Sequence, residues 1–368
     1  MKKLFHLILF AAQAVGVTSA MADFSHKAAP SEALIARTSK TFIFTFNDNV
    51  PAYLVEFKAA QIAARHNANI AFVYKNALKG FAAEISDVEA AKVPQNFPDV
   101  VSFERDAIVT TAATVAGTTA STWGVTRVGG SQPATAYAKA WVIDTGVQYK
   151  HPALVVDEAN AYSAIAGKNA DDENGHGTHV SGTIAANGWA NAAGVAIYGV
   201  AAGAAIVPVR VLDATGSGSL SAVVAGVDYV TGKRKTLCPK GYAPGPCAAE
   251  GWVVNMSLEL PANIFTKSLD TAVTNAANVG VRFAVAAGNS ALKATTATPA
   301  RVNHANVFTV SASWNKKRLS PRSGSERVPD GSASVGRRWC LRRKSPPSPH
   351  PRRASSAPRA TRFSGRAP

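Results

Sequence analysis

A series of short apolar segments separated by helical stretches limits the possible folds of this chain more than any other feature. The apolar segments are WVIDTGV (141–147), AAIVPVRVL (204–212), WVVNMSL (252–258), VRFAVAAGN (281–289) and NVFTVSAS (306–313). Helical character lies between them, in HVSGTIAA (179–186), SLSAVVAGVDYV (219–230) and KSLDTAVTNAANVG (267–280). Near-continuous apolar strands separated by helices are typical of a parallel sheet covered on both faces. The pattern therefore predicts a three-layer α/β domain, with functional residues on loops at the carboxyl ends of its strands.

A second arrangement of elements precedes this domain. Strand character is found in residues 41–46, 70–75, 77–86 and 100–109, and helical character in residues 52–66 and 87–93. The resulting order, β-α-β-β-α-β, is typical of a small ferredoxin-like α+β domain. Residues 110–122 are small and polar without periodicity, which predicts a linker. We therefore expect a small domain at 23–115 and the larger domain at 116–315.

The first residues have the pattern of a secretory signal peptide. Lys2 and Lys3 precede an apolar run from Leu4 to Val17, and Ala20-Met21-Ala22 supplies a small-residue cleavage site. The run is short for a membrane span, and no later segment is long and apolar enough to be one. The sequence thus predicts a signal peptide at 1–22 and a secreted, extracellular protein without a membrane partner.

The last residues differ in composition from both domains. Residues 316–368 are rich in Arg, Pro, Ser and Ala without an apolar period, which predicts a disordered tail. This tail carries +13 of the net charge of +16, so residues 1–315 carry only +3. A basic surface of the kind that binds nucleic acid is therefore not expected on the domains. We interpret the tail as out-of-frame sequence that replaces the native end of the larger domain.

Two of the three cysteines flank a Pro/Gly-rich loop. Cys238 and Cys247 enclose it, and Cys340 lies in the tail. In an oxidising compartment Cys238 and Cys247 are candidates for a small disulfide loop. The alternative, two unpaired loop thiols, stays open from the sequence.

Three polar residues mark the candidate site. Asp144 ends one apolar strand, Asn289 ends another, and His176 opens a helix in NGHGTHVSGTIAA. A carboxylate beside an imidazole fixes its tautomer, and a side-chain amide stabilises a developing oxyanion, so the set is suited to acyl transfer. His176 and His179 are also candidate zinc ligands, but no further ligand follows at a suitable spacing. Asp144 and Asn289 are each compatible with an ordinary turn residue.

The segments VIDTGV, NGHGTHVSGTIAA and AVAAGN, in this order, resemble those of subtilisin-like serine proteases. The domain at 23–115 is similar to the inhibitory propeptide of that family. The resemblance implies a subtilisin-like α/β domain, here incomplete, and an intramolecular inhibitor that blocks the cleft. It also implies protein or peptide substrates and a monomer. We assign no metal ligand and no certain cofactor, and the resemblance leaves a structural calcium ion open.

The resemblance implies the following roles, residue by residue. Asp144 orients His176, which is the general base, and Asn289 binds the oxyanion. His179 is expected to be structural, packed in the first turn of its helix. Four further residues are expected to bind the backbone of a peptide in the cleft, as an added strand does. They are Gly216, Gly218, Ser257 and Leu258.

Two departures from the family pattern stand out. Glu259 occupies a position where the family usually has Gly, which places a charge near the primary pocket. The nucleophile segment Gly-Thr-Ser-Met-Ala-x-Pro has no counterpart, because residues 330–334 contain serines without the Met-Ala-x-Pro continuation. We therefore expect the precursor of a serine endopeptidase whose serine segment is missing, inactive as printed. The alternative is a non-catalytic secreted protein that binds proteases through residues 23–115.

Overall fold

The computed structural model describes ten ranges of the chain. They are residues 29–112, 123–135, 138–190, 194, 196–239, 247, 251–261, 264, 266–290 and 292–311. The expected signal peptide, the basic tail with Cys340, and residues 113–122 of the expected linker lie outside them. The expectations for those segments therefore stay predictions.

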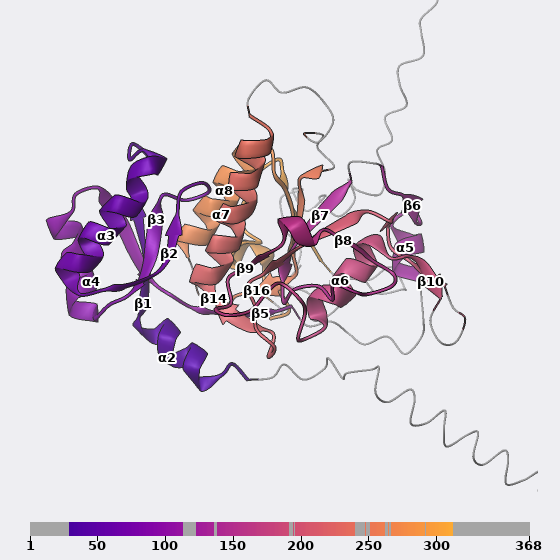
Figure 1. The fold of residues 1–368 in the computed structure, drawn as a ribbon, viewed down its shortest axis with the longest axis horizontal. Helices are drawn as coiled ribbons and strands as arrows, with labels where there is room; N and C mark the ends of the chain where they lie inside the picture. The colour runs from indigo at the N-terminus through magenta and orange to yellow at the C-terminus, as the bar shows by residue number, and fades with distance from the viewer. Residues whose placement is uncertain are drawn as a thin grey trace, which may run out of the picture.

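The N-terminal domain has the expected ferredoxin-like arrangement (Figure 1, indigo). Its antiparallel sheet has the strand order β2-β3-β1-β4. The elements in chain order are α2 (Glu32–Lys40), β1 (Thr41–Phe46), η1 (Ala52–Leu54), α3 (Val55–His66), β2 (Asn69–Tyr74), β3 (Gly80–Glu84), α4 (Asp87–Asn96) and β4 (Val100–Arg105). Phe44 and Phe81 stack with ring centroids 4.9 Å apart in its core. Helix α2 was not anticipated from the sequence.

The expected strand at 100–109 is wrong, because the chain changes sheets in its middle. Strand β4 ends at Arg105, and β5 (Ile108–Thr111) belongs to another sheet, with order β14-β5-β16. Asp106 lies at the break, where its N–H donates to Thr41 O at 2.9 Å. The expected linker therefore begins too early, since Thr110 and Thr111 are part of β5.

The second domain is built on the expected parallel sheet. Its strand order is β18-β17-β15-β7-β13-β8, and β9 also pairs with β13. Every one of these pairings is parallel. The strands are β7 (Lys139–Asp144), β8 (Val155–Val156), β9 (Tyr162–Ser163), β13 (Ala205–Arg210), β15 (Val253–Met256), β17 (Arg282–Ala286) and β18 (Val307–Val310). The apolar segments of the sequence thus form the central layer.

Helices cover both faces of this sheet, which gives the predicted three layers (Figure 1). Helix α6 (His176–Ala185) packs on one face through Val180 and Ala185, against a cluster that includes Val142. Helices α7 (Leu220–Leu237) and α8 (Lys267–Asn278) cover the other face. The short elements are α5 (Trp123–Arg127), β6 (Gln132–Pro133), η2 (Glu158–Asn160), β10 (Asn187–Ala190), β11 (Ala196–Tyr198), β12 (Ala201–Ala202), β14 (Ser217–Ser219), β16 (Leu258–Glu259) and η4 (Ala294–Thr296).

The two domains share a hydrophobic core. Ile43 and Tyr74 of the N-terminal sheet belong to the same buried cluster as Val223 and Val227 of α7. The Tyr74 hydroxyl donates to Ser221 O at 3.1 Å. In Figure 1 the N-terminal sheet lies against α7 and α8, and β5 runs on to join β14 and β16. This packing fixes β5 beside the carboxyl edge of the parallel sheet.

Cys238, at the end of α7, and Cys247 form a disulfide with an S–S distance of 2.07 Å. Cys238 is buried against the α7–α8 side of the core. Of the two alternatives that the sequence left open, a disulfide or two unpaired thiols, the structure contains the disulfide.

Candidate active site

Asp144 and His176 form a buried pair at the carboxyl edge of the parallel sheet. Asp144 is the last residue of β7 and is 0% exposed, and His176 is the first residue of α6 and is 3% exposed. His176 Nδ1 lies 2.8 Å from Asp144 Oδ1. The Thr145 N–H also donates to Asp144 Oδ1, at 2.7 Å. This contact fixes the carboxylate in the orientation that meets the imidazole.

The loop before α6 explains why the helix begins at His176. Gly175 has a φ of 102°, a conformation that glycine adopts without steric cost. Asp172 accepts hydrogen bonds from the Gly175 N–H and the Thr178 N–H, both at 2.9 Å. A carboxylate at this place satisfies amides that the first turn leaves unpaired. Sequence reasoning did not single out Asp172, although acidic residues directly before a helix are a known start signal.

A close approach of two backbones sets the distance between α6 and β7. A Cβ added to Gly177 would lie 2.0 Å from Gly146 O, so only glycine fits. The Gly177 N–H donates to Thr145 Oγ1 at 2.9 Å, and Thr145 Oγ1 donates to Asp172 Oδ1 at 2.9 Å. These bonds connect the loop that carries Asp144 to the start of the helix that carries His176.

Both ring nitrogens of His176 face acceptors. Nδ1 meets Asp144, and Nε2 lies 2.9 Å from the backbone oxygen of Ala112. Only the imidazolium donates from both nitrogens, so this arrangement favours the protonated ring. Burial alone would lower the pKa of His176, but the charge and hydrogen bond of Asp144, together with the Ala112 carbonyl, raise it above its ordinary value. The second oxygen of Asp144, Oδ2, is buried without a hydrogen bond among the described residues.

The end of the N-terminal domain lies beside His176. Strand β5 lies antiparallel between β14 and β16. The Thr111 N–H donates to Gly216 O, and the Ala112 N–H donates to Ser257 O, both at 2.9 Å. Two further cleft residues take part in the ladders, because Gly218 pairs with Val109 and Leu258 pairs with Thr111. The structure thus brings all four residues expected to bind a peptide backbone onto one extended segment.

The remaining expected residues lie outside these ladders. Asn289 follows β17, and its backbone N–H donates to Glu259 Oε2 at 2.8 Å. Among the described residues, no hydrogen bond joins the Asn289 side-chain amide to Ala112 or His176. His179 is exposed, so the expectation that it is packed in the first turn of α6 is wrong. Ala112, whose carbonyl meets His176, was not anticipated, because an alanine carries no chemical signal in the sequence.

Neither a metal centre nor a membrane span is found in the part of the chain that the structure describes. No group of three or more His, Cys, Asp or Glu side chains is arranged there to hold a metal ion. No helix of the described residues is long and apolar enough to cross a membrane.

The fold and the site together define a class of protein: a subtilisin-like α/β domain preceded by an inhibitor domain. The subtilase family model matches residues 140–338, which is more than half of the chain. The peptidase inhibitor I9 model matches residues 11–112. The chain belongs to the subtilase family.

Several relatives are named as serine proteases. The chain is 38% identical over 262 residues to an extracellular serine proteinase of Thermus sp., covering 68% of this chain and 57% of the relative. It is 35% identical over 271 residues to an alkaline serine protease of Corniculantispora psalliotae, covering 70% of this chain and 63% of the relative. The chain thus spans less than two thirds of the length of either relative.

A solved structure supports the fold. The epidermin leader peptide processing serine protease of Staphylococcus aureus superposes with a TM-score of 0.56 at 16% identity. The superposition covers 77% of this chain and 71% of that one. At this identity the likeness bears on the fold alone.

Proposed function

We propose that the chain is the precursor of a secreted serine endopeptidase that hydrolyses peptide bonds by acyl transfer. Asp144 holds the His176 imidazole, and His176 takes the proton of a serine hydroxyl and later gives it to the leaving amine. Asn289 supplies its side-chain amide to the oxyanion. The buried pair with a distance of 2.8 Å and the raised pKa of His176 support the first two roles. The names of the relatives support the reaction class.

The observation that carries this proposal is the position of Ala112. Its N–H pairs with Ser257 O and its carbonyl oxygen lies 2.9 Å from His176 Nε2. A peptide with this register presents the carbonyl carbon of the residue in this position to a nucleophile activated by His176. We propose that Gly216, Gly218, Ser257 and Leu258 hold substrates as they hold β5, and that β5 blocks the cleft as an intramolecular inhibitor.

The same contact bears on the missing serine. Among the described residues, the acceptor at His176 Nε2 is the Ala112 carbonyl and not a hydroxyl. The printed sequence has no Gly-Thr-Ser-Met-Ala-x-Pro segment, and we propose that the chain as printed does not hydrolyse peptides. Extracellular secretion, a monomeric state and the absence of nucleic-acid and membrane partners belong to this proposal too.

Covalent labelling tests the proposal directly. We expect no incorporation of a serine-directed fluorophosphonate into the printed chain, and no casein hydrolysis. We also expect another reading frame of the coding DNA beyond Lys317 to supply a Gly-Thr-Ser-Met-Ala-like segment, and the corrected chain to be labelled. Labelling of the printed chain would contradict the missing nucleophile, and a corrected chain without activity would contradict the peptidase function.

A second candidate function is protease binding without catalysis. The match of the I9 inhibitor model to residues 11–112 favours it for the N-terminal domain. The full printed chain, added in trans to an active subtilase, would then inhibit that enzyme at micromolar concentration. Inhibition that persists in a His176→Ala variant would support an inhibitory protein, whereas no inhibition would leave the peptidase precursor as the better account.

A further inference from the structure

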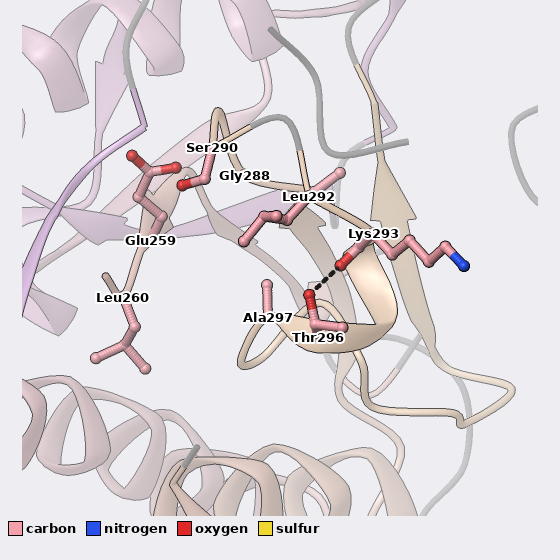
Figure 2. A pocket seen from close by; sticks show the side chains of 9 residues that line it. Glu259, Leu260, Gly288, Ser290, Leu292, Lys293, Thr296 and Ala297 are labelled. Atoms are coloured by element: carbon pink, nitrogen blue, oxygen red, sulfur yellow. Dashed lines mark hydrogen bonds between the residues drawn. The ribbon is translucent and has the colours of Figure 1, made fainter. Parts of the chain in front are cut away.

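A pocket with one carboxylate in its wall lies at the end of β16. The pocket has a volume of only about 20 Å³, and Leu260, Ala287, Leu292 and Ala297 give it largely apolar walls (Figure 2). Glu259 is the acidic residue of the lining. Lys293 also lines the pocket, but its ammonium group points away from Glu259 in Figure 2.

The Glu259 carboxylate connects the two walls of this pocket. Glu259 belongs to β16, on one wall of the pocket. Its Oε2 accepts a hydrogen bond at 2.8 Å from the N–H of Asn289, a residue that follows β17 on the other wall. A Cβ on Gly288 would lie 3.6 Å from the same oxygen, so the carboxylate packs over the face of that glycine. Figure 2 shows the carboxylate turned toward Gly288 and Ser290. The side chain therefore crosses the gap between the walls.

The register of β5 places Ala112 on the same face as Glu259. In an antiparallel ladder, residues that stand opposite each other point to the same face, and the face alternates along each strand. Glu259 stands opposite Thr110, so Ala112, two residues on, shares that face. Thr111 and Leu258 also stand opposite each other, and both are buried on the other face. A long side chain at position 112 is thus a diagonal neighbour of the Glu259 carboxylate, roughly 7–8 Å away along the backbone and within reach.

We propose that Glu259 determines specificity by size: it closes the pocket toward the cleft, so that the residue in the position of Ala112 must be small. This inference rests on the proposed function, because the residue in the position of Ala112 belongs to a substrate only if the chain is a peptidase precursor. A large side chain at that position meets the carboxylate, and moving the carboxylate breaks its bond to the Asn289 N–H. The partly buried Asn289 amide would then lose its partner, which opposes the movement. Ala112 is small enough to leave the contact intact.

Amide hydrogen exchange of the full printed chain tests the proposal without any hydrolysis. The Thr111 and Ala112 amides donate to Gly216 O and Ser257 O, so their protection reports how firmly β5 is docked. We expect Ala112→Phe to speed exchange over residues 109–112 about tenfold or more, after correction for intrinsic rates, while Ala112→Ser does not. Combining Ala112→Phe with Glu259→Ala is expected to restore protection close to that of the unchanged chain. Combining Ala112→Phe with Glu259→Gln, which keeps the length of the side chain, is not expected to restore protection.

The outcomes separate size from charge and from unfolding. Full protection in Ala112→Phe, or equal loss in the Glu259→Ala and unchanged backgrounds, would overturn the proposal. Restored protection of Ala112→Phe by Glu259→Gln would mean selection by charge and would overturn the proposal as well. The same holds if Ala112→Lys docks better than Ala112→Met only when Glu259 is present. Exchange in β7 monitors the fold. If Ala112→Phe also exposes β7, Ala112→Val and Ala112→Leu provide the same comparison in smaller steps. These exchange results do not depend on peptidase activity. Failure of the proposed function is therefore recognised separately, by the labelling and hydrolysis assays.

Discussion

The buried carboxylate of Asp106 should make the docking of the two domains stronger in mild acid. Asp106 is 6% exposed and accepts hydrogen bonds from the Ala107 N–H and the Ser221 N–H, each at 2.9 Å, and from the Ser221 hydroxyl. Burial raises the pKa of Asp106 from 3.8 to about 6, although the hydrogen bonds from Ser221 and Ala107 oppose the shift. Undocking exposes the carboxyl to water, where its ordinary pKa applies.

The sign and size of the effect follow from this shift. A raised pKa means that the docked state binds a proton more readily than the undocked state. Asp106 therefore adds stability that is complete only below pH 3.8 and is lost as the pH rises through about 6. With these two values, the docked state gains about tenfold, or about 1.4 kcal/mol, between pH 8 and pH 5. The raised pKa values of Asp228 and His176 act in the same direction.

Urea unfolding of Asp106→Asn isolates this contribution. The free energy of unfolding is measured for the unchanged chain and the variant between pH 5 and pH 8, followed by fluorescence of the buried Trp141 and Trp252. The difference between the two chains should change by about 1.4 kcal/mol over this range, in favour of the unchanged chain at pH 5. Asp48→Asn, which removes an exposed carboxyl of the same domain, is the control and should show no such change. A difference that is independent of pH, or that grows toward pH 8, would refute the reasoning.

Three further changes have definite expected outcomes. Asp144→Asn should lower the pKa of His176, measured by NMR titration of the imidazole, because burial remains while the opposing carboxylate charge is removed; an unchanged pKa would contradict the assigned cause. Gly177→Ala should destabilise the chain by about 1–3 kcal/mol in urea, because its Cβ meets Gly146 O, whereas Gly182→Ala in the same helix meets no atom within 4 Å and should be neutral or stabilising. Replacing Cys238 and Cys247 by Ser should cost about 2.6 kcal/mol, since the disulfide closes a loop with a sequence separation of 9, and a loss below about 0.5 kcal/mol would argue against this loop-closure reasoning.

Most of the architecture followed from the period of apolar residues, and the exceptions have a physical reason. The strands of the parallel sheet were found because their residues are apolar on both faces. The change of sheet at Asp106 could not be found in this way. Residues on both sides of the break have strand character, and β5 pairs with segments more than one hundred residues further along the chain. Helix α2 was missed because it is largely exposed and has only Leu34 and Thr38 buried.

In the candidate site, too, some residues were predicted from local motifs and others could be found only from the fold. Asp144 and His176 stand in distinctive local motifs, and the structure places their side chains 2.8 Å apart. Ala112 acts through a contact that local sequence does not encode, since it offers only a backbone carbonyl. Asp172 was missed although its signal is local, because it accepts the Gly175 and Thr178 N–H groups only a few residues further along the chain. Glu259 was visible as an unusual residue, but its contact with the Asn289 N–H required the fold.

The carboxylates between the two domains couple docking to the start of two helices. The N-cap of α8, Thr266, makes no side-chain capping bond, and Glu104 of the N-terminal domain accepts the Lys267 and Ser268 N–H groups instead, at 2.9 and 3.2 Å. Asp106 does the same for the Ser221 N–H in the first turn of α7, which has no acidic residue of its own. Helix starts need such acceptors, and the helix dipole favours a negative charge there. Because the acceptors come from the N-terminal domain, the first turns of α7 and α8 are fully satisfied only while that domain is docked. Its docking therefore stabilises the two helices that cover one face of the parallel sheet.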